Sequence, residues 1–256
     1  MRIPLPAAFL AAPLAHRAYH DRAQGRPENS RGAIKAAIAA GYGVEIDLQL
    51  SSDGIAMVFH DEALDRLTTS IGLVKNNTAA DLGQINLRDC DETIPTLAEI
   101  LTLVAGRTPL LIEIKDQTDT MSETDGRLEA ATASLLAAYQ GPVAVMSFNP
   151  HSIAQMARLA PQIPRGLTTS AFNTTDWAPL APETCDHLRD IPDYDRTLSS
   201  FISHEAADLA RLRVTALKSQ GAAILCWTIR SPAAEGKARN IAQNITFEGY
   251  TAALPA

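Results

Sequence analysis

The feature that most constrains the fold is a regular alternation of short apolar runs and amphipathic segments along nearly the whole chain. The apolar runs have the length and continuity of strands buried on both faces of a parallel sheet. The segments between them carry helix signals, such as Ser30 before one segment and Gly41, Gly141 and Gly221 after others. Strand and helix repeated to eight predict an α/β fold of the (β/α)8 TIM barrel type. The expected strands are 8–15, 43–50, 110–115, 143–148, 165–169, 201–204, 223–229 and 244–249. The expected helices are 30–40, 96–105, 128–139, 150–160, 206–220 and 232–242, and residues 170–200 are expected to be irregular.

One segment departs from this alternation. Residues 48–59 form two alternating runs joined at Asp53-Gly54, which is a strong signal for a β-hairpin. The second run should return antiparallel to the end of the second strand and bring His60 level with Asp47. We therefore expect a single domain over 1–256, with a small insertion at about 51–93 after strand two.

The charge balance limits the class of partner. The net charge is −7, which argues against nucleic acid or an anionic membrane surface as the main partner. An anionic small-molecule substrate is still allowed, provided that it meets a locally positive pocket. No apolar stretch reaches the ~18 residues that a membrane-spanning helix needs, so stable membrane insertion is not expected.

The cysteines and the first residues bear on the compartment. Cys90, Cys185 and Cys226 form no Cys-x-x-Cys pair, which disfavours zinc and a disulfide framework and favours reduced thiols in the cytoplasm. Residues 1–15 somewhat resemble a secretion signal, but prolines interrupt the apolar stretch. We interpret this stretch as the first strand, which delivers His16, instead of an export signal.

Ionisable residues gather at the ends of the first strands, where TIM barrels carry their functional groups. Residues two apart on a strand point the same way, so Glu45 and Asp47 share a face. Because Val44, Ile46 and Leu48 supply the apolar face that the helices need, both acids should point into the barrel. Four groups occupy such positions: His16-Arg17, Glu45 with Asp47, His60-Asp61, and Glu113 with Lys115.

Three inward carboxylates repel one another unless a cation lies among them. Their all-oxygen ligation favours calcium, magnesium or manganese over zinc. An isolated Glu-x-Asp pair more often lies on a solvated face, but the apolar neighbours of Glu45 and Asp47 favour the inward orientation. Lys115 can be a plain ion-pair partner of Glu113 or can touch a phosphate, and the residues do not decide between these. His16 and His60 each end an apolar run, whereas His20, His151, His187 and His204 look structural or superficial.

With these motifs in place, the chain resembles the glycerophosphodiester phosphodiesterases over nearly its whole length. Two positions depart from the family pattern: Ala18 replaces the glycine of His-Arg-Gly, and Phe247-Glu248-Gly249 stands where the family has Asp-Gly followed by Thr-Asp. The matching motifs are His16-Arg17, Pro27-Glu28-Asn29-Ser30, Glu45-Ile46-Asp47, Asp53-Gly54, Phe59-His60-Asp61, Ile94-Pro95-Thr96-Leu97, Glu113-Ile114-Lys115, Ser147-Phe148-Asn149-Pro150 and Trp227-Thr228.

The resemblance implies a metal-dependent hydrolase of lipid metabolism that converts glycerophosphodiesters to glycerol 3-phosphate and an alcohol. It implies that Glu45, Asp47 and Glu113 bind Ca²⁺ or Mg²⁺, and that Arg17 and Lys115 hold phosphate oxygens. It also implies that His16 and His60 share the acid and base roles, and we favour His60 as the first base. Trp227 either stacks on the glycerol end of the substrate or is a core aromatic.

Two alternatives are kept. One is a lysophospholipase D-like phosphodiesterase on the same barrel, with the loops setting the choice of headgroup. The other is a barrel that binds a phosphodiester without turnover. The presence of both His16 and His60 beside the acids argues against pure binding, because binding needs no proton transfer.

Overall fold

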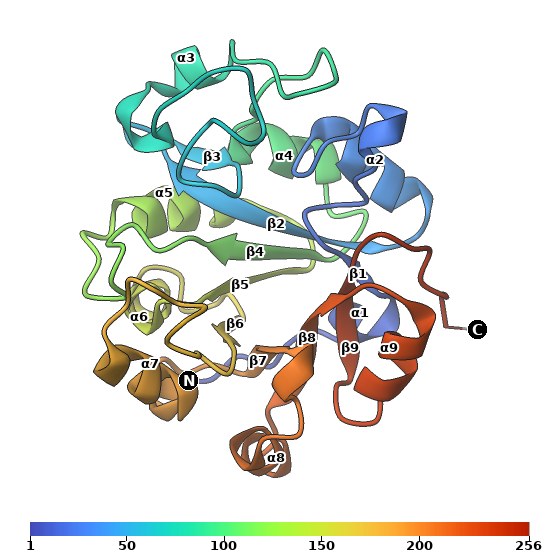
Figure 1. The fold of residues 1–256 in the computed structure, drawn as a ribbon, viewed down its shortest axis with the longest axis vertical. Helices are drawn as coiled ribbons and strands as arrows, with labels where there is room; N and C mark the ends of the chain where they lie inside the picture. The colour runs from blue at the N-terminus through green and yellow to red at the C-terminus, as the bar shows by residue number, and fades with distance from the viewer. Residues whose placement is uncertain (256) are drawn as a thin grey trace.

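The computed structural model describes residues 1–255, in which parallel strands close into a barrel surrounded by helices (Figure 1). The strand order is β1-β9-β8-β7-β6-β5-β4-β2-β3, and the additional pairing of β1 with β2 closes the ring. The expectation of a (β/α)8 TIM barrel is confirmed. The barrel strands are β1 Leu14–Ala15, β2 Gly43–Leu50, β4 Leu110–Ile114, β5 Val143–Ser147, β6 Arg165–Thr169, β7 Phe201–Glu205, β8 Ala223–Ile229 and β9 Asn244–Phe247, and β3 Ala56–Val58 lies outside the ring.

The prediction of a strand over 8–15 is wrong for most of its length. Residues Ala8–Ala11 form a short helix, α1, and only Leu14–Ala15 pair as β1. The side chain of Phe9 is fully buried in a cluster with Leu14 and Phe201, and the amide of Asn244 donates to the carbonyl oxygens of Phe9 and Ala12. The segment before β1 therefore packs against the start of β9 and contributes to the core instead of extending the sheet.

Most helices begin where the sequence signals placed them. Ser30 caps α2, and Thr96 with Glu99 forms a complete capping box at the start of α4. The helix expected at 206–220 is divided into a 3₁₀ turn, Ala206–Asp208, and α8. Residues 170–200, which we expected to be irregular, contain α7. Its mostly polar sequence has too weak a periodicity to predict a helix. The helices are α2 Arg31–Ala39, α3 Ala79–Leu82, α4 Leu97–Val104, α5 Arg127–Leu136, α6 Pro150–Leu159, α7 Pro182–Arg189, α8 Leu212–Ser219 and α9 Pro232–Ala238.

The hairpin after β2 forms as predicted, but its register differs by one residue. β2 and β3 are antiparallel with Leu48 opposite Val58, and the amide of Phe59 donates to the carbonyl oxygen of Asp47. Phe59, and not His60, is therefore level with Asp47. The turn is longer than the dipeptide Asp53-Gly54 because the hydroxyl of Ser51 bonds across it, and a one-residue slip follows from that extra length.

Residues 51–93 protrude from the barrel beside β2, at the top of Figure 1, where they carry β3 and α3. They have a small apolar cluster of their own, which includes Phe59, Leu64, Leu67 and Val74. We infer that they form an insertion within a single domain and that this cluster anchors the segment that carries His60. Among residues 1–255, no helix is both long enough and apolar enough to cross a bilayer.

Candidate active site

Three buried acids converge on one face of the neighbouring strands β2 and β4. Asp47 and Glu113 are register partners on these neighbouring strands, and Glu45 lies two residues before Asp47 on the same face. Carboxylate oxygens of the three residues lie within 4.8 Å of one another. Val44, Ile46 and Leu48 point the other way into the main core, as the alternation required. The structure therefore brings together the three acids that the sequence singled out.

The three acids do not share one electrostatic environment. Burial, together with the nearby Asp47 and Glu113, raises the pKa of Glu45 well above its usual range. Burial also acts to raise the pKa of Asp47, but His60, Lys115 and Arg17 outweigh it and lower that pKa to about 2. Glu45 is thus the acid that most lacks a positive partner.

The donor set fits a hard divalent cation. All three groups are carboxylates, which suit calcium, magnesium or manganese and offer no soft ligand for zinc. A cation among them would relieve the repulsion that raises the pKa of Glu45. We take these residues as a candidate metal site.

His16 follows β1 and is held by an acid from the far end of the chain. Its Nδ1–H donates to Oε2 of Glu248 across 2.5 Å, and Oε1 of Glu248 accepts a bond of 2.8 Å from Arg230. The hydrogen bond from His16 lowers the pKa of Glu248 far below its usual range. Burial lowers the pKa of His16 itself, although Glu248 acts the other way. With Nδ1 engaged by an ionised carboxylate, Nε2 is the ring nitrogen left for proton transfer.

Our sequence reasoning did not assign Glu248 a role. The available signal was an acid directly after the last strand, at the same barrel end as the other ionisable groups. We interpreted the segment only as a departure from the family pattern. Its contact with His16 joins residues that lie 232 positions apart in the sequence.

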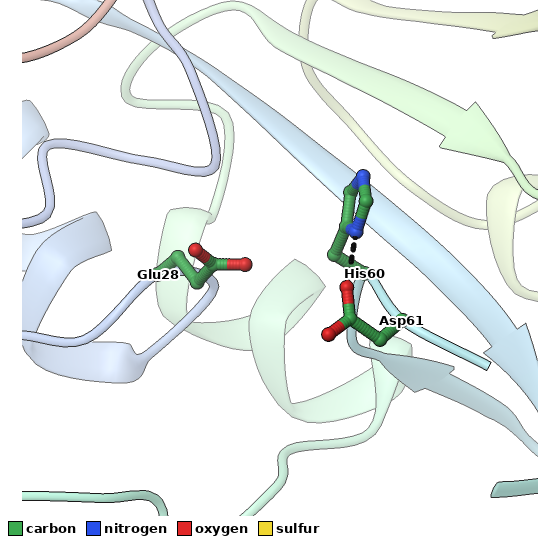
Figure 2. A group of neighbouring side chains, drawn as sticks. All are labelled: Glu28, His60 and Asp61. Atoms are coloured by element: carbon green, nitrogen blue, oxygen red, sulfur yellow. Dashed lines mark hydrogen bonds and ion pairs between the residues drawn. The ribbon is translucent and has the colours of Figure 1, made fainter. Parts of the chain in front are cut away.

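His60 repeats the arrangement of His16. Its Nδ1 lies 2.6 Å from Oδ1 of Asp61, a contact that Figure 2 shows, and its Nε2 lies 3.4 Å from Nζ of Lys115. Each predicted catalytic histidine therefore has one nitrogen tied to a carboxylate. Such a bond fixes the tautomer and the orientation of the ring, and it leaves the other ring nitrogen to exchange a proton.

Arg17 and Lys115 provide positive charge beside the acids. The backbone amide of Arg17 donates to Oε2 of Glu45 at 2.8 Å, and its Nη1 donates to Glu28 at 2.9 Å. The Nε of Arg17 is buried and has no hydrogen-bond partner within residues 1–255. Lys115 forms the ion pair with Glu113 that the sequence left open, with 2.9 Å between Nζ and Oε1.

The backbone after His16 is strained. Arg17 and Ala18 have φ values of 50° and 66°, in the left-handed region that favours glycine. The second value explains why a glycine suits the position that Ala18 occupies in this chain. Strain of this kind collects at functional sites, where the surrounding contacts hold it in place.

All eight predicted site residues line one cavity of about 140 Å³. Trp227 is among them, and its indole nitrogen donates to the carbonyl oxygen of Ser203 while its ring packs against Phe148. A wider cleft of about 550 Å³ adjoins the cavity and shares His60, Glu113, Lys115 and Phe148 with it. The cavity is lined by His16, Arg17, Glu45, Asp47, His60, Glu113, Lys115, Met146, Phe148, Trp227, Thr228, Arg230 and Thr246.

The family model and the relatives that match this chain agree on one family. Residues 16–246 match the model of the glycerophosphoryl diester phosphodiesterase family. A glycerophosphodiester phosphodiesterase of Caldanaerobacter subterraneus subsp. tengcongensis is 32% identical over 159 residues, which are 59% of this chain and 65% of that protein. The match thus spans slightly less than two thirds of the relative's length. A glycerophosphodiester phosphodiesterase of Bacillus altitudinis is 41% identical over 96 residues, 35% of this chain and 39% of that protein.

A solved structure extends the likeness over the whole fold. The phosphodiesterase of Oleispira antarctica, in complex with the product sn-glycerol-3-phosphate, superposes with a TM-score of 0.75. It is 25% identical and the match covers 94% of each chain.

Proposed function

Because the chain belongs to the glycerophosphoryl diester phosphodiesterase family, we propose that it hydrolyses glycerophosphodiesters to glycerol 3-phosphate and an alcohol. The observation that carries the proposal is the single cavity in which three converging carboxylates face two histidines, each oriented by its own acid. The Oleispira relative, whose structure holds sn-glycerol-3-phosphate, supports the choice of product. Pure binding would not need two oriented imidazoles.

Glu45, Asp47 and Glu113 would hold Ca²⁺ or Mg²⁺. When bound, such a cation lowers the pKa of a substrate hydroxyl and offsets charge on the phosphoryl oxygens. Arg17 has its buried Nε available for a phosphate oxygen, and Nη1 stays with Glu28. Lys115 already lies between Glu113, Asp47 and His60, so a small movement of Nζ would bring it to a second phosphate oxygen.

The cavity and the wider cleft suggest different roles for His16 and His60. His16 lines the smaller cavity, whereas His60 lines both that cavity and the wider cleft. If glycerol occupies the smaller cavity, Nε2 of His16 takes the proton of the 2-hydroxyl as its oxygen attacks phosphorus. His60, which enters this step with both ring nitrogens protonated, gives its Nε2 proton to the departing alcohol as the bond from phosphorus to that oxygen breaks. This order is the reverse of the one we favoured from the sequence.

The second step returns both histidines to their starting states. The first step leaves a five-membered cyclic phosphate, with a proton on His16 and none on Nε2 of His60. His60 can then remove a proton from water that attacks phosphorus, and His16 returns its proton to the 2-oxygen of glycerol as that bond breaks. The products are glycerol 3-phosphate and the free alcohol.

The wider cleft would receive the leaving alcohol. Its walls carry Asp116, Asp119 and Asp176 as well as the rings of Phe148 and Trp177. Acidic and aromatic walls favour a cationic alcohol over an anionic one. We therefore expect headgroups with an ammonium group to be better substrates than phosphorylated ones.

Product analysis on a panel of glycerophosphodiesters tests the function directly. The panel contains choline, ethanolamine, glycerol and phosphorylated alcohols as leaving groups, each with EDTA, Mg²⁺ or Ca²⁺. Metal-dependent release of glycerol 3-phosphate supports the proposal, and binding without turnover would indicate a binding barrel. A lysophospholipid added to the panel identifies lysophospholipase D-like activity, which we do not expect to dominate.

We also propose a cytoplasmic role in lipid metabolism, since the three cysteines are free thiols and the proposed substrates derive from phospholipids. Fractionation of cells that produce the protein would test the compartment.

A further inference from the structure

Beside the catalytic cavity, one arginine holds two carboxylates at once. Arg66, in the insertion after β3, donates to Asp61 through Nε at 2.6 Å and through Nη2 at 2.8 Å. The same guanidinium donates to Glu28 through Nη2 at 2.6 Å and through Nη1 at 3.0 Å. Figure 2 shows Glu28 approaching His60 and Asp61 from a separate segment of the chain. The spacing of Glu28, His60 and Asp61 would suit a metal, but Arg66 supplies the positive charge there.

Each of these carboxylates also holds a residue of the proposed catalytic machinery. Asp61 accepts from Nδ1 of His60 at 2.6 Å, and Glu28 accepts from Nη1 of Arg17 at 2.9 Å. A continuous chain of hydrogen bonds therefore runs from the ring of His60 to the guanidinium of Arg17, with Arg66 at its centre. It links the residue proposed for proton transfer to the residue proposed for phosphate binding.

The geometry of this network differs from that of an ordinary surface ion pair. The side chains of Glu28 and Asp61 are only 11% and 21% exposed, although Arg66 is 49% exposed. Planar, two-pronged contacts of this kind fix orientation in a way that a single flexible contact does not. Without Arg66, two partly buried carboxylates would lose the guanidinium between them, and each could turn away from the residue that it orients.

We propose that Arg66 is a positioning residue of the phosphodiesterase reaction, which sets His60 through Asp61 and Arg17 through Glu28. The inference rests on the proposed function for its kinetic consequences, but the hydrogen-bond chain itself does not. The proposal also assigns a function to the insertion at 51–93, since that segment supplies both Asp61 and Arg66 and packs them against the barrel.

Steady-state kinetics of Arg66→Gln test the proposal. We expect kcat to fall by about 10–100-fold, as is typical when a partner that orients an active-site ligand is removed. Arg66→Lys should lose nearly as much activity, because an ammonium group cannot form the planar contacts with both carboxylates. Guanidinium ion, added to Arg66→Ala far below denaturing concentrations, should restore part of the rate. A kcat within twofold of the parent, or full activity of the lysine variant, would overturn the proposal.

A spectroscopic measurement keeps the test independent of turnover. In protein with ¹⁵N-labelled histidine, at a pH at which the ring of His60 is neutral, the parent should show the Nδ1–H tautomer of His60, and Arg66→Gln should lose that preference. If the tautomer is unchanged in the variant, Arg66 does not position His60. If the parent shows no hydrolysis of any substrate, the proposed function is wrong, and the tautomer still decides the role of Arg66.

Arg22→Gln is the matched control. Arg22 pairs with Asp89 at the surface, where both side chains are more than half exposed, and neither lines the cavity or the cleft. Its substitution should leave kcat and the His60 tautomer unchanged. Thermal unfolding of each variant shows whether a loss of activity comes with a loss of fold. A lower melting temperature of Arg66→Gln with parental kcat and tautomer would mean that Arg66 is purely structural.

Discussion

Replacing Glu45 by glutamine should make the metal-free protein more stable while removing its response to metal. Glu45 is 1% exposed and lies with Asp47 and Glu113 in a group whose oxygens are within 4.8 Å of one another. Two unit charges at that separation, 4.8 Å, repel by about 3.5 kcal/mol at an effective dielectric constant of about 20. The isosteric amide removes this repulsion and can still accept the amide hydrogen of Arg17.

The expected gain is smaller than the full repulsion. Burial and the neighbouring acids raise the pKa of Glu45, so the parent already avoids part of the cost by holding a proton there. We expect the free energy of unfolding without metal to rise by about 2 kcal/mol, which corresponds to about 4–8 °C in melting temperature for a domain of this size. Activity should be lost, because the variant offers one carboxylate fewer to the cation.

Differential scanning calorimetry in EDTA and in a titration of Mg²⁺ or Ca²⁺ measures both effects. The parent should gain about 2.7 kcal/mol when the metal concentration is 100 times its Kd, and Glu45→Gln should gain far less. Glu129→Gln serves as a control, since Glu129 is equally buried but its carboxylate contacts Thr124, outside the cavity. A lower melting temperature of Glu45→Gln in EDTA, or an undiminished response to metal, would refute the reasoning.

Three further predictions concern single residues. Arg17→Lys should lose almost as much kcat/KM as Arg17→Ala, because an ammonium group cannot keep the contact with Glu28 and also offer a donor to phosphate from the position of Nε, and near-parental activity would make Arg17 structural. Glu248→Gln should lower kcat by about 10–100-fold, because a neutral amide stabilises the working tautomer of His16 less well; an unchanged kcat would contradict this role. Burial lowers the pKa of His204, although Asp208 acts the other way, so the unfolded chain takes up a proton first as the pH falls through about 6.5, and stability should decline below that pH. Urea unfolding of the parent and His204→Gln at pH 7.5 and 5.5 measures this effect, and equal pH dependence of the two proteins would exclude His204 as its source.

Local patterns in the sequence were enough to predict the barrel and much of the cavity. The expected strands 43–50, 165–169 and 223–229 have the observed bounds of β2, β6 and β8. The alternation around Glu45 and Asp47 predicted their inward direction, since the faces of a strand repeat every two residues. Such periodicities depend only on neighbours in the chain, so they can be read without a tertiary structure.

The partners of the ionisable groups could not be predicted in this way. Glu248 reaches His16 across 232 residues, and Arg66 reaches Glu28 across 38, because ring closure and the packing of the insertion bring these segments together. The turn of Ser51, Asp53 and Gly54 moved Phe59 opposite Asp47, a shift of one residue that no periodic pattern encodes. The sequence by itself determined which side chains point into the barrel, whereas only the tertiary structure decided which charges meet there, since strand direction is a local property and charge pairing depends on distances between remote segments.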